Sequence, residues 1–130
     1  MKPKILVVAA NYYEKISFEL NLYASSILDK KTKYKFISVP GVFEIPVVIS
    51  KNIKKYDGFI ALGCVIKGET PHFDFISSAT TNAIMKLSIE HKKPIGNGII
   101  TCLNMNQAEA RSKTKGIEAA KAVLSVLKNF

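Results

Sequence analysis

Three things are scarce in this sequence of 130 residues: cysteine, arginine and long apolar runs. Its two cysteines, Cys64 and Cys102, lie far apart within apolar segments, and neither has a histidine or another cysteine at metal-ligand spacing. We therefore expect two buried free thiols and no metal site. No apolar run approaches the length needed to cross a bilayer, so no membrane-spanning helix is expected.

The amino terminus, MKPKILVVAANYYEK, has a basic start followed by an apolar run, as in a secretory signal peptide. The run extends only from Ile5 to Ala10, and no small-residue cleavage site follows it. A first β-strand is the better interpretation, and the chain is expected in the cytoplasm. At this length, with 48% hydrophobic residues, residues 1–130 are expected to form one domain.

Charge is strongly unbalanced: the formal net charge is +9, and Arg111 is the one arginine among 19 basic residues. Clustered basic side chains bind the phosphates of nucleic acids, but such binding requires a continuous basic face. The lysines are instead spread along the whole chain, many of them just before or after predicted helices. We therefore expect a small anionic substrate and no nucleic-acid or membrane partner, with a basic nucleic-acid binder as an alternative.

Apolar runs alternate with segments of helical periodicity from end to end. Runs rich in β-formers predict four strands, at 4–10, 34–39, 58–66 and 95–102. Apolar residues at helical spacing predict helices between and after the strands: one that includes 16–28, a short one at 46–55, a long one that follows Thr70, and two segments at 104–113 and 116–128. This alternation predicts a parallel sheet covered by helices on both sides.

Ligands of such sheets bind beyond the carboxyl ends of the strands. The loops that follow the four predicted strands are therefore the candidate binding loops: NYYEK (11–15), PGVFEIP (40–46), KGETPH (67–72) and LNMN (103–106).

The segment KGETPHFD carries the richest chemistry of these loops. Thr70 and Pro71 suit the cap and the first position of a helix, which predicts a helix N-terminus with free amides, a common anion site. An ordinary capped helix has no need of His72, where the positive helix end favours a neutral ring able to accept a proton. His72 is therefore the candidate for proton transfer. His91, at the basic end of the same helix, is interpreted as a solvated residue.

In the segment PGVFEIP, two prolines bracket an apolar loop that contains Glu44. A rigid loop of this kind can offer backbone amides to a ring or a polyol. The alternative is a turn in which Glu44 caps the next helix. Tyr12 and Tyr13 have the rings to stack on a flat heterocycle, although tyrosines at a strand end commonly serve packing alone.

Four segments, VPGVFEIP, ALGCVIKGETPHFDFIS, NQAEAR and KGIEAA, resemble in order and spacing the motifs of the 6,7-dimethyl-8-ribityllumazine synthase family of riboflavin biosynthesis. The resemblance covers nearly the whole chain, and the pair GETPHFD and PGVFEIP is highly specific. It implies a three-layer α/β/α sandwich with a flavodoxin-like, four-stranded parallel sheet of order 2-1-3-4. It also implies a transferase without cofactor, which condenses 5-amino-6-(D-ribitylamino)uracil with 3,4-dihydroxy-2-butanone 4-phosphate and releases phosphate and water.

The resemblance also implies a role for each matching residue. His72 is the proton shuttle, and Arg111 is the phosphate-binding arginine, a task that suits a planar, bidentate guanidinium better than lysine. Lys115 matches a second basic residue of the site. The remaining matches imply substrate contacts: Tyr12 stacks on the pyrimidine, Val42, Phe43 and Glu44 hold the ribityl chain and ring, Cys64, Val65 and Ile66 line the floor, and Gly68, Glu69 and Thr70 form the loop on the phosphate side.

Active sites of the family form between neighbouring subunits of a pentamer, so the resemblance implies that Arg111, Lys115 and Asn97 reach the pocket of an adjacent chain. Asn97 replaces a phenylalanine that many members pack on the substrate ring, and a hydrogen bond is expected there instead. Only the residues SKT separate Arg111 from Lys115, where the family usually has a longer Gly-x-Lys-x-Gly bend. The longer bend accompanies icosahedral shells in some relatives. A homopentamer or decamer is therefore expected in preference to a 60-mer, and association with a riboflavin synthase is left open.

A noncatalytic flavin- or phosphate-binding module of the same architecture is the second hypothesis. It would explain the anion site and the aromatic residues. It would not explain why His72 and Arg111 occur together, and this pairing favours the enzyme.

Overall fold

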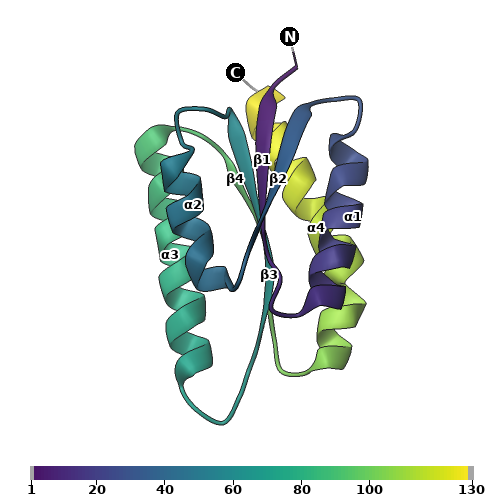
Figure 1. Ribbon diagram of the computed structural model, residues 1–130, viewed down its shortest axis with the longest axis vertical. Helices are drawn as coiled ribbons and strands as arrows, with labels where there is room; N and C mark the ends of the chain where they lie inside the picture. Colours follow the sequence, from purple (N-terminus) through teal and green to yellow (C-terminus); the bar gives the residue numbers. More distant parts are fainter. Residues whose placement is uncertain (1, 129–130) are drawn as a thin grey trace.

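The computed structural model describes residues 2–128 and shows a sheet between two pairs of helices (Figure 1). Met1, Asn129 and Phe130, which belong to the expected domain, lie outside the described residues. The elements follow one another as β1 (Lys4–Ala10), α1 (Glu14–Leu28), β2 (Lys33–Val39), a 3₁₀ turn (Val42–Glu44), α2 (Ile45–Lys51), β3 (Gly58–Ile66), α3 (His72–His91), β4 (Ile95–Cys102) and α4 (Met105–Lys128).

The four strands are parallel and lie in the order β2-β1-β3-β4, so the expected sandwich and its strand order are confirmed. In Figure 1, α2 and α3 cover one face of the sheet, and α1 and α4 cover the other. The central strands β1 and β3 are buried along nearly their whole length. This double burial explains why both sequences are uninterrupted apolar runs with no polar face.

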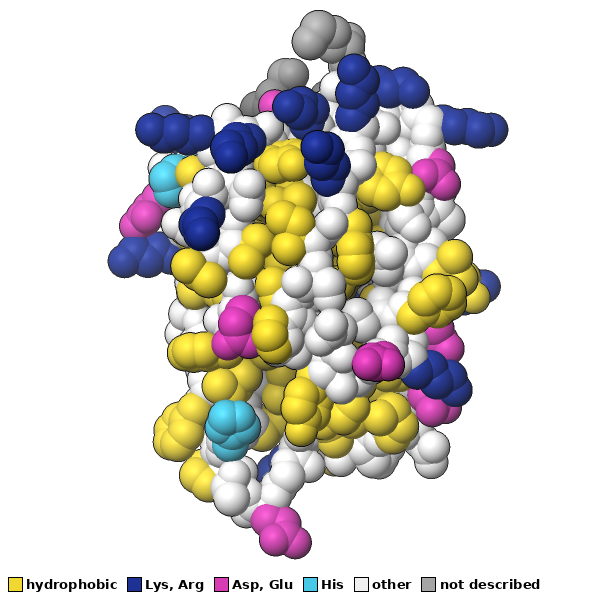
Figure 2. Space-filling view, viewed as in Figure 1, with side chains coloured by type: hydrophobic (Ala, Val, Ile, Leu, Met, Phe, Trp, Pro, Cys, Tyr) yellow, Lys and Arg dark blue, Asp and Glu magenta, His cyan; other side chains and the backbone are white. Residues whose placement is uncertain are grey.

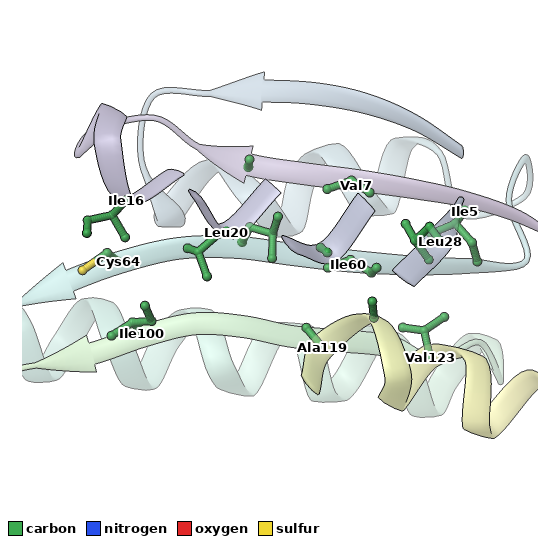
Figure 3. Close-up of a cluster of buried hydrophobic side chains, with 14 of the residues drawn as sticks. Ile5, Val7, Ile16, Leu20, Leu28, Ile60, Cys64, Ile100, Ala119 and Val123 are labelled. Atoms are coloured by element: carbon green, nitrogen blue, oxygen red, sulfur yellow. The ribbon is translucent and has the colours of Figure 1, made fainter. Parts of the chain in front are cut away.

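Alternate residues of the central strands belong to two separate hydrophobic cores, because successive side chains of a strand point to opposite faces of the sheet. On one face, Ile5, Val7 and Ile60 pack against residues of α1 and α4 such as Leu20 and Val123 (Figure 3). On the other face, strand residues including Leu6, Val8 and Phe59 pack against α2 and α3. Both cores hold the strands in register, which fixes where their carboxyl ends lie.

The strands at 4–10, 58–66 and 95–102 are confirmed, and the second strand begins one residue earlier than predicted. The short helix ends at Lys51, not at residue 55, because the chain then turns into β3. The long helix begins at His72, with Pro71 at its cap position. Thr70 is therefore not the full cap that was expected: its Oγ1 accepts a weak bond from the His72 amide at 3.4 Å.

The two helical segments predicted at 104–113 and 116–128 are one continuous helix, α4, and the expectation of two was wrong. Gly116 lies inside this helix and is buried against α1. A Cβ at this position would lie 2.7 Å from the carbonyl oxygen of Leu20. Nearby, the Ser112 hydroxyl donates to Glu19 Oε2 at 2.6 Å. The glycine therefore lets two helices approach closely, and that packing outweighs its low helix propensity.

Among residues 2–128, no helix combines the length and the apolarity that crossing a bilayer would require.

We predict that Gly116→Ala destabilises the fold by about 1–3 kcal/mol, because the new methyl group must push α1 away from α4. At an unconstrained helix position the same change would stabilise by about 1 kcal/mol. Urea denaturation measures the difference. Ser125→Ala, at an exposed position of the same helix, is the control and should leave stability unchanged or slightly raised. A Gly116→Ala protein more stable than the parent would contradict the close packing.

Candidate active site

A cavity of about 670 Å³ lies at the carboxyl end of the sheet, the edge that parallel topology predicts for a ligand. Its volume falls within the range of roughly 300–1,000 Å³ that is typical of small-molecule sites. Three connections converge on it: those that follow β1, β2 and β3. The lining residues are Tyr12, Tyr13, Gly41, Val42, Phe43, Glu44, Cys64, Val65, Ile66, Gly68, Thr70, His72, Phe73 and Ile76.

The loop after β2 forms one wall of the cavity through a 3₁₀ turn. Val42 is buried and packs directly over Gly63, where a Cβ would lie 2.6 Å from Val42 Cγ1. Glu44 Oε1 accepts a hydrogen bond from the Gly41 amide at 3.0 Å. The carboxylate thus closes its own 3₁₀ turn and makes no capping bond to α2, so the expectation that its side chain caps the next helix was wrong; Glu44 also lies at the cavity wall.

The N-terminus of α3 forms the opposite wall. His72 is the first residue of the helix and its side chain is exposed. The Asp74 and Phe75 amides bond to the Pro71 carbonyl at 3.1 and 3.2 Å, while the His72 amide has only its weak bond to Thr70. The weakly bonded His72 amide, at the positive end of a 20-residue helix, favours an anion in this part of the cavity.

Two tyrosines that follow β1, Tyr12 and Tyr13, line the cavity. Their rings meet edge to face, with centroids 4.9 Å apart. Tyr12 is 75% exposed, so one face of its ring is open to a ligand. Tyr13 lies deeper, where burial raises the pKa of its phenol. The position of this loop is fixed because Asn11 Nδ2 donates to Ser38 Oγ on the neighbouring strand at 2.9 Å.

The end of β3 forms the floor with Cys64, Val65 and Ile66. Cys64 and Cys102 are both buried and free, as the sequence predicted. Burial raises the pKa of Cys64 to about 12, and the neighbouring Cys102 contributes to the shift. A thiol with this pKa stays protonated at neutral pH, so Cys64 acts as an apolar surface and not as a nucleophile.

Four predicted site residues do not line this cavity: Glu69, Asn97, Arg111 and Lys115. Glu69 is exposed in the loop before α3, and Asn97 is exposed on β4, an edge strand of the sheet. Arg111 is exposed on α4, with Nη1 3.5 Å from the Thr101 carbonyl oxygen at the end of β4. Lys115 is half-buried one turn further along α4. Within one chain, His72 and Arg111 therefore do not share this cavity.

Four lining residues were not among the predicted substrate contacts: Tyr13, Gly41, Phe73 and Ile76. Tyr13 has a ring suited to stacking, as Tyr12 does, but the family resemblance implies a substrate contact for Tyr12 alone. Phe73 and Ile76 are apolar residues at helical spacing, and periodicity does not distinguish a core position from a cavity wall. Gly41 had no signal beyond its place between Pro40 and Val42.

In the part of the chain that the structure describes, no group of three or more histidine, cysteine, aspartate or glutamate residues is placed to hold a metal ion.

Fold and cavity together define an α/β protein with a small-molecule site at the carboxyl edge of a parallel sheet. The model of the 6,7-dimethyl-8-ribityllumazine synthase family matches residues 2–130. The chain is 44% identical to the 6,7-dimethyl-8-ribityllumazine synthase of Bartonella tribocorum over 134 residues, which cover 97% of this chain and 89% of the relative. It is 43% identical to that of Bartonella bacilliformis (98% and 90% covered) and 41% identical to that of Agrobacterium fabrum (97% and 93% covered). The chain belongs to the 6,7-dimethyl-8-ribityllumazine synthase family.

We predict that Cys64 in the folded protein reacts with iodoacetamide at pH 8 at least about 100-fold more slowly than a free cysteine, because so little of it is thiolate. Mass spectrometry of the alkylated peptides measures the rate at this residue. The same protein in denaturant is the control, and there Cys64 should react at the ordinary rate. Folded-state alkylation within tenfold of the denatured rate would contradict the raised pKa.

Proposed function

We propose that this chain condenses 5-amino-6-(D-ribitylamino)uracil with 3,4-dihydroxy-2-butanone 4-phosphate to form 6,7-dimethyl-8-ribityllumazine, with release of phosphate and water. The observation that carries the proposal is one cavity lined both by the loop PGVFEIP and by the segment KGETPHFD. The chain thus acts as a transferase of riboflavin biosynthesis, and its site of action is the cytoplasm.

The aromatic and apolar part of the cavity suits the pyrimidine substrate. Tyr12 offers an exposed ring for stacking, and Phe43, which is 60% exposed, lines the same cavity. The Gly41–Glu44 loop takes the ribityl chain, with Val42 and Phe43 packing against it. Cys64, Val65 and Ile66 support the ring from below through apolar contact.

Proton transfer is the task of His72. The amine of the uracil adds to the ketone and loses water to form an imine, phosphate then leaves by elimination, and ring closure expels a second water. Each step moves protons to or from carbon, nitrogen or oxygen. His72 lines the cavity and is the first residue of α3. An imidazole there can move protons beside the departing phosphate.

The phosphate group binds at the N-terminus of α3, near Gly68, Glu69 and Thr70. Residues of a neighbouring chain complete this phosphate site. Arg111 supplies a planar fork of donors for two phosphate oxygens. Lys115 adds a second positive charge, and Asn97 approaches the substrate ring with a hydrogen-bonding side chain. All three residues are at least partly exposed and lie outside the cavity of their own chain. This supports the proposal that they contribute to the site of a neighbouring chain.

The assembly that provides this neighbour is a homopentamer or a decamer, in preference to a 60-mer. Three large apolar residues of α3, Phe75, Met85 and Ile89, are 59–68% exposed in the isolated chain. Exposed apolar residues along one helix are typical of an interface between chains. The unbroken course of α4 through Arg111 and Lys115 leaves no bend of the kind that accompanies shells. No surface is assigned to a riboflavin synthase.

We predict that His72→Ala lowers turnover about 10²–10⁴-fold, the usual contribution of a general acid–base residue. Binding of the phosphate substrate should be retained, because His72 does not hold the phosphate. Mixing both substrates with purified protein and following the lumazine absorbance measures the rate.

His91→Ala is the matched control, since it removes the other histidine at the far end of the same helix. Its turnover should equal that of the parent. An unchanged rate for His72→Ala would refute the enzymatic role of His72. No lumazine from the parent protein would favour a noncatalytic binding module of the same fold.

A further inference from the structure

Lysines that are spread along the sequence gather at one end of the folded chain. All four strands begin, and all four helices end, at the end opposite to the cavity, and lysines lie at or near these junctions. Figure 2, viewed as Figure 1, shows the dark-blue side chains concentrated at this end. We call it the basic end and define it by Lys2, Lys4, Lys30, Lys31, Lys33, Lys51, Lys54, Lys55, Lys92, Lys93 and Lys128.

The basic end holds the whole net charge of the chain. Its eleven lysines, together with Asp29 and Asp57 in the same connections, give a formal charge of +9, which equals the net charge of the full sequence. The other eight basic residues and the other eight carboxylates cancel. The molecule is therefore electrically polarised, with its net positive charge concentrated at one end.

Neither aspartate of the basic end pairs with a lysine side chain. Asp57 Oδ2 accepts from the Lys4 backbone amide at 2.8 Å, and Asp29 Oδ1 accepts from the Tyr34 hydroxyl at 2.7 Å. The ion pairs recorded for residues 2–128 are Lys15–Glu109 and Lys86–Glu90, both outside the basic end. None of these eleven lysines therefore has a carboxylate partner among the described residues, although the half-buried Lys93 donates from its Nζ to the Ile53 carbonyl oxygen at 2.6 Å.

Neutralisation of helix dipoles accounts for only a small part of this charge. Four helices end at the basic end, and each helix C-terminus carries about −0.5 of a charge, or about −2 in total. A charge of +9 exceeds this by far. Self-repulsion among so many neighbouring lysines is unfavourable, and an external polyanion would relieve it.

We propose that the basic end binds the phosphate backbone of duplex nucleic acid without reading its sequence. Lysine ammonium groups are point charges that neutralise phosphates and release counterions, whereas base recognition relies mainly on arginine and on amide side chains. Single-stranded binding and membrane insertion both use exposed aromatic or large apolar residues. Among residues 2–128, the strongly exposed aromatic residues, Tyr12, Phe18, Phe36, Phe43 and Phe75, all lie outside the basic end. Two exposed aliphatic residues, Ile89 and Val126, line a groove with Lys92 and Lys93, so the comparison with vesicles below is the test of membrane binding.

An acidic protein is a less suitable partner for this surface. Protein interfaces are enriched in tyrosine, tryptophan and arginine and depleted in lysine. The basic end has the opposite composition.

The sequence alone predicted no nucleic-acid partner because its lysines were not clustered along the chain; parallel topology clusters them in space.

Fluorescence anisotropy with a labelled DNA duplex of mixed sequence tests the proposal, across a salt series. The logarithm of the association constant should fall linearly with the logarithm of the salt concentration, by about 0.9 for each phosphate neutralised. The triple variant Lys31→Gln, Lys54→Gln, Lys55→Gln removes three exposed charges of the basic end. Its slope should be shallower than that of the parent by about 2–3.

The matched control is Lys15→Gln, Lys86→Gln, Lys113→Gln, which removes three exposed lysines outside the basic end and changes the net charge equally. Its salt slope should equal that of the parent, and circular dichroism should show both variants folded. The proposal would be overturned if the salt slope of duplex binding fell equally in the two variants. It would also be overturned if the parent protein did not bind the duplex at 50 mM salt. Tighter binding to anionic phosphatidylserine vesicles or to polyglutamate than to the duplex would overturn the choice of partner.

Discussion

The parallel arrangement of four strands is the constraint on which the rest of this molecule depends. After each strand, the chain must return to the same side of the sheet before the next strand begins. Every strand therefore ends at one edge of the sheet and starts at the opposite edge. The first edge collects the loops after β1, β2 and β3 and the positive end of α3. The second collects the helix C-termini and eleven lysines. Topology alone thus separates a cavity from a basic surface.

Much of this could be predicted from sequence because the strongest signals are local. The strands at 4–10 and 58–66 are apolar runs, and the candidate loops follow directly from where strands end. The predictions that were wrong concerned contacts between segments far apart in the sequence. Gly116 suggested a break between helices, yet its lack of a side chain lets α4 pack against the Leu20 carbonyl. Phe73 and Ile76 line the cavity, yet their helical spacing would suit a buried core equally well, because periodicity does not show what a helix face contacts.

The candidate active site is open within a single chain. Tyr12, Phe43 and His72 surround the cavity with strongly exposed side chains, and the one arginine of the sequence lies elsewhere, beside the end of β4. A cavity with an imidazole and a helix N-terminus can hold a phosphate substrate, but a bidentate cation would hold it better. The proposed completion of the site by an adjacent chain would account for both observations. It would also make catalysis depend on assembly, so that the exposed apolar residues of α3 contribute to function as well as to stability.

Complementation between two inactive variants tests this shared site most directly. His72→Ala and Arg111→Ala proteins would be unfolded together, refolded as mixed oligomers and assayed for lumazine formation. If each site takes His72 from one chain and Arg111 from the next, random mixing in a ring restores both residues in about one quarter of the sites. The mixture should then show about a quarter of the parent activity. Activity no greater than the average of the two variants measured separately would contradict a site shared between chains.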